Sequence, residues 1–197
     1  MLLPYLFVIA GYLCGSLASA IIICKLLRLG DPRTEGSRNP GATNVMRLHG
    51  RTPALLTLAG DTLKGLLPVV AAQALGQPAT VVALTGLAAF IGHLYPVFFG
   101  FQGGKGVATL IGILFGIHWQ LGLCFVVTWL IMALLLRYSS VAALTAAMLT
   151  PIYTSLLLPN LLVVGVTCVM TLLVIWRHRS NIRNLMLGEE GRIGQKD

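Results

Sequence analysis

Long apolar runs, separated by short polar segments, occupy most of the chain. Most runs predict a membrane helix by their length, and the short run 106–117 is read as a helix because long apolar runs flank it. The runs cover residues 2–24, 53–75, 79–99, 106–117, 119–136, 141–158 and 161–176. The polar remainder is the loop 30–52, the short links between runs and the tail 177–197. This pattern predicts an all-α integral membrane protein with seven transmembrane helices.

The stretch 106–136 is read as two helices. As one helix it would be about 46 Å long at 1.5 Å per residue, against a hydrocarbon core of ~30 Å. The break is placed at His118–Trp119 because tryptophan is common at membrane interfaces. The first of the two helices is short, and Gly112 and Gly116 give it the G-x-x-x-G spacing that permits close helix packing.

Composition supports the membrane class. The 197 residues are 56% hydrophobic and 10% charged, whereas soluble domains carry about 25% charged residues. Little is left for a soluble domain, so we expect one membrane-embedded domain over residues 1–197. The cysteines lie singly in apolar runs, so they predict neither a disulfide nor a metal site.

Basic residues predict the orientation. None precedes the first run, while Lys25 and Arg28 follow it, which places the N-terminus outside and the C-terminus in the cytoplasm. The inside segments are then 25–52, 100–106, 137–140 and 177–197. They contain thirteen of the 14 lysines and arginines, and Lys64 is the exception. Topology therefore explains the net charge of +8, with no nucleic-acid partner, and every polar cluster faces the cytoplasm.

The segment 100–109, G-F-Q-G-G-K-G-V-A-T, predicts a phosphate site. Glycines allow backbone N–H groups to converge on an anion, and Lys105 adds a positive charge. A helix opening at Gly106 or Val107 would contribute its positive N-terminal end. The spacing is not that of a nucleotide P-loop, which needs four residues before its G-K pair and a hydroxyl after it. The alternative is a glycine-rich turn whose lysine extends to the interface.

Two further polar clusters offer groups for a phosphorylated substrate. The stretch from Glu35 to Arg47 contains small hydroxyl and amide side chains around an N-P-G turn. Its candidates are Ser37, Asn39, Thr43, Asn44 and Arg47. The second cluster, R-Y-S-S, ends at Ser140. Capped turns and basic interfacial anchors explain both clusters equally well without a ligand.

The last cluster, W-R-H-R-S-N-I-R, supplies a candidate for proton transfer. His178 and Asn181 are three residues apart and share one face if the helix continues that far. Imidazole titrates near neutrality, which suits a general base. A histidine anchoring a helix end is the alternative. Glu190 is interpreted as structural, paired with an arginine on the inside face.

Some chemistry is disfavoured by what the sequence lacks. Asp61 and Lys64 lie one turn apart inside a span, where mutual pairing is the simpler account of their charges. No acidic residue occurs between Asp61 and Glu189, which disfavours a metal site built from several carboxylates. No histidine is followed by aspartate five residues later, and no G-x-S-x-G motif is present. His49, His93 and His118 are given no role.

Taken together, these motifs resemble the bacterial acyl-phosphate:glycerol-3-phosphate acyltransferase family (PlsY). The resemblance covers essentially the whole chain, including its length. It is carried by G-S-R-N-P-G-A-T-N at 36–44, G-H-L-Y-P-V-F-F-G-F-Q-G-G-K-G-V-A-T at 92–109, H-R-S-N-I at 178–182, D-x-x-K-G at 61–65, and Ser140. Three positions depart from the family pattern. Arg38 replaces a usual third glycine, Asn184 a usual arginine, and Ala143 a frequent serine.

The resemblance implies acyl transfer from acyl phosphate to the 1-hydroxyl of glycerol 3-phosphate at the bacterial inner membrane. The products would be lysophosphatidic acid and phosphate, with no cofactor, metal, acyl-CoA or acyl carrier protein. The implied catalytic residues are Ser37, Arg47, Lys105, His178 and Asn181. The implied substrate-binding residues are Asn39, Thr43, Asn44, Gly103, Gly104, Gly106 and Ser140, with Glu190 structural.

Two points stay open at this stage. The base that takes the hydroxyl proton is either His178 or a phosphate oxygen of the substrate. A small transporter for a phosphorylated solute would also use glycines and basic groups inside the membrane. Such transporters usually show two related halves with sites at the midplane, whereas here no repeat is visible and the clusters share one face. An interfacial enzyme is therefore favoured, and a non-catalytic scaffold would leave the clusters unexplained.

Overall fold

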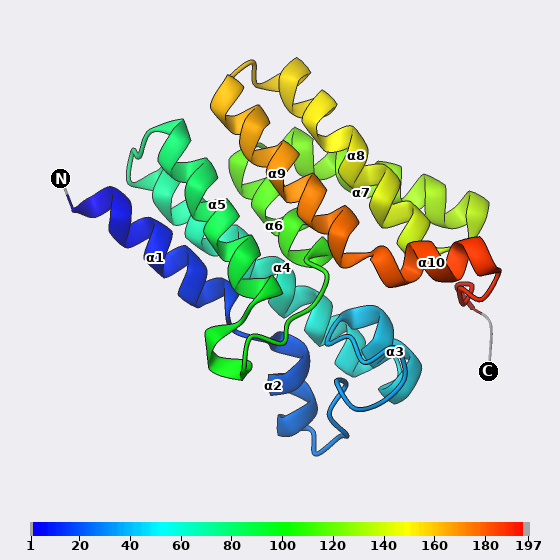
Figure 1. The fold of residues 1–197 in the computed structure, drawn as a ribbon. Coiled ribbons are helices and arrows are strands. Elements are labelled where there is room, and N and C mark those ends of the chain that lie inside the picture. The colour runs from blue at the N-terminus through cyan, green and yellow to red at the C-terminus, as the bar shows by residue number, and fades with distance from the viewer. Residues whose placement is uncertain (1, 195–197) are drawn as a thin grey trace. The chain divides into compact units, whose positions relative to one another are not determined.

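The structure is a computed structural model that describes residues 2–194, and the regular secondary structure of these residues is all helical (Figure 1). The chain forms two compact units, Met1–Ile117 and His118–Asp197. That the two units act as one membrane-embedded domain stays a prediction.

The first unit is built around two close helix pairs. Its elements are α1 (Leu3–Gly15), α2 (Ser19–Leu26), α3 (Ala42–His49), α4 (Arg51–Ala74), α5 (Ala79–Leu94), the 3-10 turn η1 (Val97–Phe99) and α6 (Val107–Ile117). Helix α1 packs on α5, and α4 packs on α6. Gly65 and Gly112 leave no room for a Cβ against the backbones of Thr109 and Thr62. Small residues therefore bring α4 and α6 into backbone contact, as predicted for the G-x-x-x-G helix.

The first apolar run is not one continuous helix, as the pattern 2–24 predicted. Helices α1 and α2 are bent by 45° around residues 16–18. At this break the Lys64 ammonium donates a hydrogen bond of 2.8 Å to the backbone carbonyl of Leu17. Backbone groups released from a helix at membrane depth need a partner inside the protein. The break is thus stabilised by a side chain 47 residues away, which hydrophobicity alone does not reveal.

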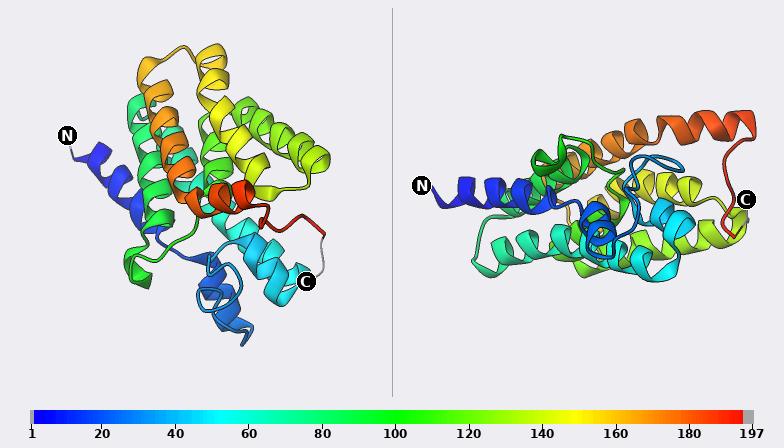
Figure 2. Two further views of the ribbon diagram at one scale, coloured as in Figure 1. Left: turned by 45° about the vertical axis from the view of Figure 1, so that its right-hand side comes forward. Right: turned by 90° about the horizontal axis from the view of Figure 1, so that it is seen from below.

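The second unit contains the remaining four helices. They are α7 (Trp119–Leu136), α8 (Ser139–Leu157), α9 (Leu161–Arg177) and α10 (Arg179–Leu187). Helix α8 packs on both α7 and α9, and short links join the three into an up-and-down array (Figure 2). The predicted break at His118 is confirmed, since α6 ends at Ile117 and α7 begins at Trp119. Within the predicted polar tail, the chain bends by 51° at His178 and continues as α10.

Four to six spans are long and apolar enough to cross a membrane among the described residues. Four are single: Arg51–Ala74, Ala79–Phe99, Trp119–Leu136 and Ser139–Leu157. Two more arise if the bent pairs α1–α2 and α9–α10 each count as one span. Helix α6 has 11 residues and is about 16 Å long, roughly half the hydrocarbon core. The protein is therefore an all-helical integral membrane protein, and the predicted seventh crossing depends on α6.

Candidate active site

The segment between α2 and α3, residues 27–41, is called the first loop. Its shape depends on Asn44, which lies on α3 and is 1% exposed. Its side-chain oxygen accepts a hydrogen bond from the backbone N–H of Ser37 at 3.0 Å. Its amide nitrogen donates to the carbonyls of Pro32 and Glu35 at 2.9 and 3.2 Å. These contacts give Asn44 a role in holding the loop. The substrate-binding role predicted from sequence stays a prediction.

The other candidates of this loop surround that buried amide. Ser37, Thr43 and Arg47 are exposed, and Asn39 is half-buried. Gly41 is the N-cap of α3, with Thr43 in the first turn and Arg47 in the last. The chain therefore presents a serine hydroxyl, a threonine hydroxyl and a guanidinium from one loop-helix unit, which matches the groups that phosphate oxygens require.

Arg38 adopts the left-handed backbone conformation, with φ +55°. That conformation costs a residue with a Cβ about 1 kcal/mol or more, whereas glycine adopts it freely. The structure thus explains the third glycine that the resemblance leads us to expect at this position. The loop conformation is formed with arginine there, so the departure leaves the backbone path intact.

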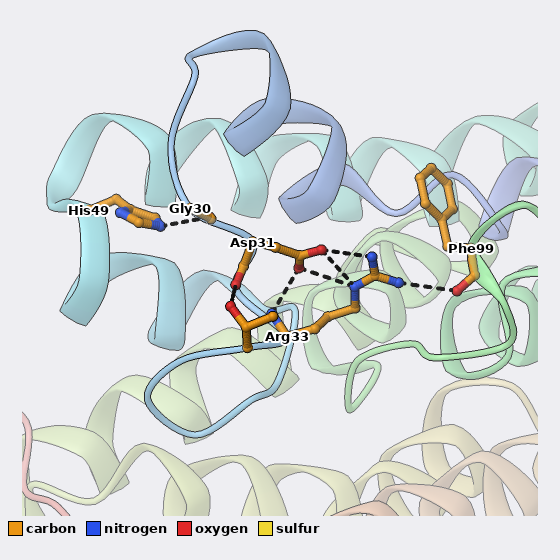
Figure 3. Close-up of polar contacts among 6 residues, drawn as sticks. Gly30, Asp31, Arg33, His49 and Phe99 are labelled. Carbon is orange, nitrogen blue, oxygen red and sulfur yellow. Dashed lines mark hydrogen bonds and ion pairs between the residues drawn. The ribbon is translucent and has the colours of Figure 1, made fainter.

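A hydrogen bond from Arg33, which is ion-paired with Asp31, connects the first loop to the segment before the glycine loop (Figure 3). The Arg33 guanidinium donates to both carboxylate oxygens of Asp31, with a closest distance of 2.7 Å, and to the carbonyl of Phe99 at 3.4 Å. Next to Asp31, the Gly30 carbonyl accepts a hydrogen bond of 3.0 Å from the ring of His49, the last residue of α3. The first loop is therefore fastened to both η1 and α3.

Asp31→Asn is expected to loosen the first loop. Hydrogen bonds from Arg33 hold the pKa of the Asp31 carboxyl below its usual value. A carboxylate with a lowered pKa stabilises the fold above its unfolded pKa of about 3.9, and that contribution disappears as pH falls through the folded value. Trypsin cleavage after the exposed Arg38 should therefore be faster in the variant at pH 7. Equal cleavage rates would show that the ion pair does not hold the loop.

The glycine loop, residues 102–106, lies against the C-terminal end of α5. Gly104 leaves no room for a Cβ beside the His93 ring, and Gly103 leaves none beside the backbone carbonyls of His93 and Leu94. Gly106, at φ +87°, lies against the Phe90 ring. All three glycines are thus required by close contact.

Helix α6 begins directly after this loop. The Gly106 carbonyl accepts the N–H of Leu110 at 2.8 Å, which makes Gly106 the N-cap and confirms that a helix opens at Val107. The positive end of α6 therefore lies at the loop that carries Lys105, which is half-buried. The Pro40 carbonyl lies 3.4 Å from the position a Cβ on Gly104 would take. The first two polar clusters are therefore neighbours within the first unit.

The second unit brings together the other two clusters through Glu190. One carboxylate oxygen accepts hydrogen bonds from the Ser140 hydroxyl at 2.6 Å and the Asn181 amide at 2.7 Å. Glu190 thereby connects the start of α8 to α10 through two neutral side chains, and its predicted structural role with an arginine partner stays a prediction. The predicted contacts of Ser140 and Asn181 with substrate stay predictions.

His178 lies at the bend between α9 and α10 and is 3% exposed. Its Nδ1 is 2.8 Å from the carbonyl of Val174. A carbonyl can only accept, so Nδ1 carries the proton and the lone pair of the neutral ring is on Nε2. The local fold thus selects the tautomer in which Nε2 can act as a base.

The sequence interpretation gave no role to Asp31, Arg33 or His93. D-P-R is a typical turn in which aspartate accepts the N–H two residues later, and Arg33 does donate to Asp31 in this way. His93 precedes Tyr95-Pro96 and was read as background. Its position ten residues before Gly103 gave no indication that the chain turns back upon it.

Comparisons with known proteins identify the family of the chain. The family model for glycerol-3-phosphate acyltransferase matches residues 5–188. The chain is 55% identical to the glycerol-3-phosphate acyltransferase of Hydrogenovibrio crunogenus, over 94% of this chain and 90% of that protein. It is 51% identical to that of Thioalkalivibrio sulfidiphilus, over 100% and 97% of the two chains.

Solved structures of PlsY, an integral membrane glycerol 3-phosphate acyltransferase, have the same fold. The glycerol 3-phosphate form has a TM-score of 0.92 and 40% identity, covering 97% of this chain and 96% of that one. The lysophosphatidic acid form has a TM-score of 0.89 and 39% identity, covering 97% and 95%. The protein is a helical membrane acyltransferase. It belongs to the glycerol-3-phosphate acyltransferase family represented by PlsY.

Proposed function

We propose that this enzyme transfers a fatty acyl group from acyl phosphate to the 1-hydroxyl of glycerol 3-phosphate, the first acylation step of phospholipid synthesis. The glycine loop carries the proposal, because its backbone, Lys105 and the N-terminus of α6 form one anion-binding unit beside the first loop. PlsY structures with glycerol 3-phosphate and with lysophosphatidic acid support the same acceptor and product.

The chemistry requires two phosphorylated molecules to approach each other. Lys105, Arg47 and the loop N–H groups offset their repulsion and hold the departing phosphate. The acceptor oxygen forms a bond to the acyl carbon as the bond from that carbon to the phosphate oxygen breaks. The leaving group is already activated, so no cofactor or metal is required, and no acyl-enzyme is needed.

His178 is proposed as the base. Its Nε2 takes the proton of the attacking hydroxyl, while the Val174 carbonyl holds Nδ1–H in place. Ser37 and Asn181 then orient substrate oxygens. Glu190 keeps Asn181 in position by accepting a hydrogen bond from its amide nitrogen. Asn39, Thr43 and Ser140 are proposed to complete the binding of polar substrate groups.

The proposed setting is the bacterial inner membrane, with seven crossings, the N-terminus outside and the active site facing the cytoplasm. The basic segments support this orientation, and α6 would be the crossing that begins below the surface, at the glycine loop. A cysteine placed at Gln77 in a cysteine-free variant should react with an impermeant maleimide added outside intact cells. Reaction only after the membrane is opened would overturn the topology.

The donor is the part of the proposal that is most easily tested. Purified protein with radiolabelled glycerol 3-phosphate should form lysophosphatidic acid with palmitoyl phosphate and not with palmitoyl-CoA or palmitoyl-acyl carrier protein. If the protein formed product with palmitoyl-CoA and not with palmitoyl phosphate, the acyl donor would be acyl-CoA. If the folded protein formed no product but moved glycerol 3-phosphate into vesicles, it would be a transporter and not an acyltransferase.

A further inference from the structure

Three ionisable side chains are buried together in the first unit. Asp61 and Lys64 on α4 form an ion pair of 2.8 Å, and their side chains are 3% and 4% exposed. The Nδ1 atom of His93 on α5 lies 3.7 Å from the same Asp61 oxygen, which is an electrostatic contact longer than a hydrogen bond, and this side chain is 5% exposed. Lys64 also donates to the Leu17 carbonyl. The predicted pairing of Asp61 with Lys64 is therefore confirmed and extended to a third group.

Helix packing alone does not require these charges. Removing charges from water is costly, and a buried ion pair can often be replaced by apolar residues without loss of stability. The rest of α4 already packs on α6 through glycines. A network of this kind therefore calls for an explanation beyond holding the two helices together.

The opposite edge of the His93 ring supplies that explanation. Its Nε2 lies directly against Gly104, so closely that a Cβ there would collide with it. The imidazole thus stands between Asp61 on its Nδ1 side and the glycine loop on its Nε2 side. The next residue after Gly104 is Lys105. A tilt of the ring toward Gly104 would press on the backbone that precedes Lys105 and the N-terminus of α6.

We propose that Asp61, Lys64 and His93 form a positioning network for the phosphate-binding loop. Lys64 holds the Asp61 carboxylate, Asp61 orients the His93 ring through Nδ1, and the Nε2 edge of the ring sets the backbone conformation at Gly104. The network touches no substrate itself. It rests on the proposed acyl transfer, in which the loop binds a substrate phosphate, and it assigns a role to charges inside the membrane that the catalytic mechanism does not use.

Two isosteric substitutions separate the two edges of the ring. In His93→Asn the amide nitrogen replaces Nδ1, so the contact with Asp61 is kept and the one with Gly104 is lost. In His93→Gln the amide nitrogen replaces Nε2, so the Gly104 side is kept. We expect His93→Asn to raise one substrate's KM about tenfold, because the loop loses the ring edge against which its backbone packs, with kcat changed much less. His93→Gln should stay within about threefold of the wild-type KM.

The KM values for palmitoyl phosphate and glycerol 3-phosphate are measured separately, beside Lys105→Arg. The network predicts that His93→Asn and Lys105→Arg raise the same KM, which identifies the phosphate that the loop binds. Thr85→Val, on the same helix, loses only a hydrogen bond to the Val81 carbonyl and should leave both KM values unchanged. His93→Asn with wild-type KM values, or with a loss confined to kcat, would overturn the proposal.

A double variant decides the outcome if the His93 variants do not fold. Asp61→Asn/Lys64→Gln removes both charges together and leaves a side-chain amide that can donate to the Leu17 carbonyl, so no buried charge is left unpaired and folding should be retained. The same KM should rise about threefold, as the upper limit for His93→Gln, because in both proteins the Gly104 contact remains while the Asp61 carboxylate no longer orients it. Unchanged KM values in this folded protein would refute the network. Wild-type protein without lysophosphatidic acid formation would refute the proposed function instead.

Discussion

Lys105→Met should lower kcat/KM by about 10²–10³-fold, as the loss of one preorganised donor to a developing charge typically does. Lys105 is the full positive charge of a loop whose other contributions are backbone N–H groups and the N-terminus of α6. The phosphate leaves with additional negative charge on its oxygens. A methionine of similar length preserves packing while removing that stabilisation. Initial rates of phosphate release over a range of both substrates give the value.

Two controls show whether the effect belongs to the loop. Lys105→Arg keeps the charge with a different shape and should recover much of the loss, with a raised KM. Lys25→Met removes an exposed lysine of α2 and should change kcat/KM by less than about twofold, because exposed charges interact weakly through water. If Lys25→Met and Lys105→Met were equally impaired, only the overall positive charge would matter.

His178→Asn should lower kcat by about 10²–10⁴-fold, the usual contribution of a positioned base. The asparagine amide nitrogen can still donate to the Val174 carbonyl, as Nδ1 does in the native protein. The bend between α9 and α10 should therefore persist, and the variant lacks only the basic nitrogen at Nε2. Single-turnover measurements with saturating substrates isolate the chemical step from binding.

His178→Ala separates the structural part of this role from the chemical part. It removes both nitrogens, so it should be as slow as His178→Asn and also less stable to heat in detergent. If His178→Asn turned over at nearly the wild-type rate with its fold intact, a substrate phosphate oxygen would be the base. His178 would then be a structural residue of the bend.

Hydrophobic patterning predicted most of the helices because most apolar runs are long enough to be unambiguous, and 106–136 was divided by a length argument. It missed the break between α1 and α2, which depends on a hydrogen bond from Lys64 to the Leu17 carbonyl. It also missed α3 and α10, which are too short and polar to register as apolar runs. Local pattern identifies a segment that must be buried, whereas the partners that end or bend it come from distant parts of the chain.

The same distinction between local and distant determinants applies to the site residues. Glycines around Lys105 indicated a phosphate loop because that chemistry depends on local backbone freedom. The contact of Gly104 with His93 was not predictable, since it arises from the chain turning back along α5. Asn44 was grouped with ligand-binding residues because an amide suits phosphate, and only the fold reveals its three bonds within the loop.

The measurement that tests the central claim most directly is phosphate release from palmitoyl phosphate by the purified protein, with and without glycerol 3-phosphate. Direct transfer predicts release only when both substrates are present, with one lysophosphatidic acid formed for each phosphate and no radiolabelled palmitoyl group left on the quenched protein. A burst of phosphate without glycerol 3-phosphate, together with label on the protein, would contradict direct transfer and establish an acyl-enzyme.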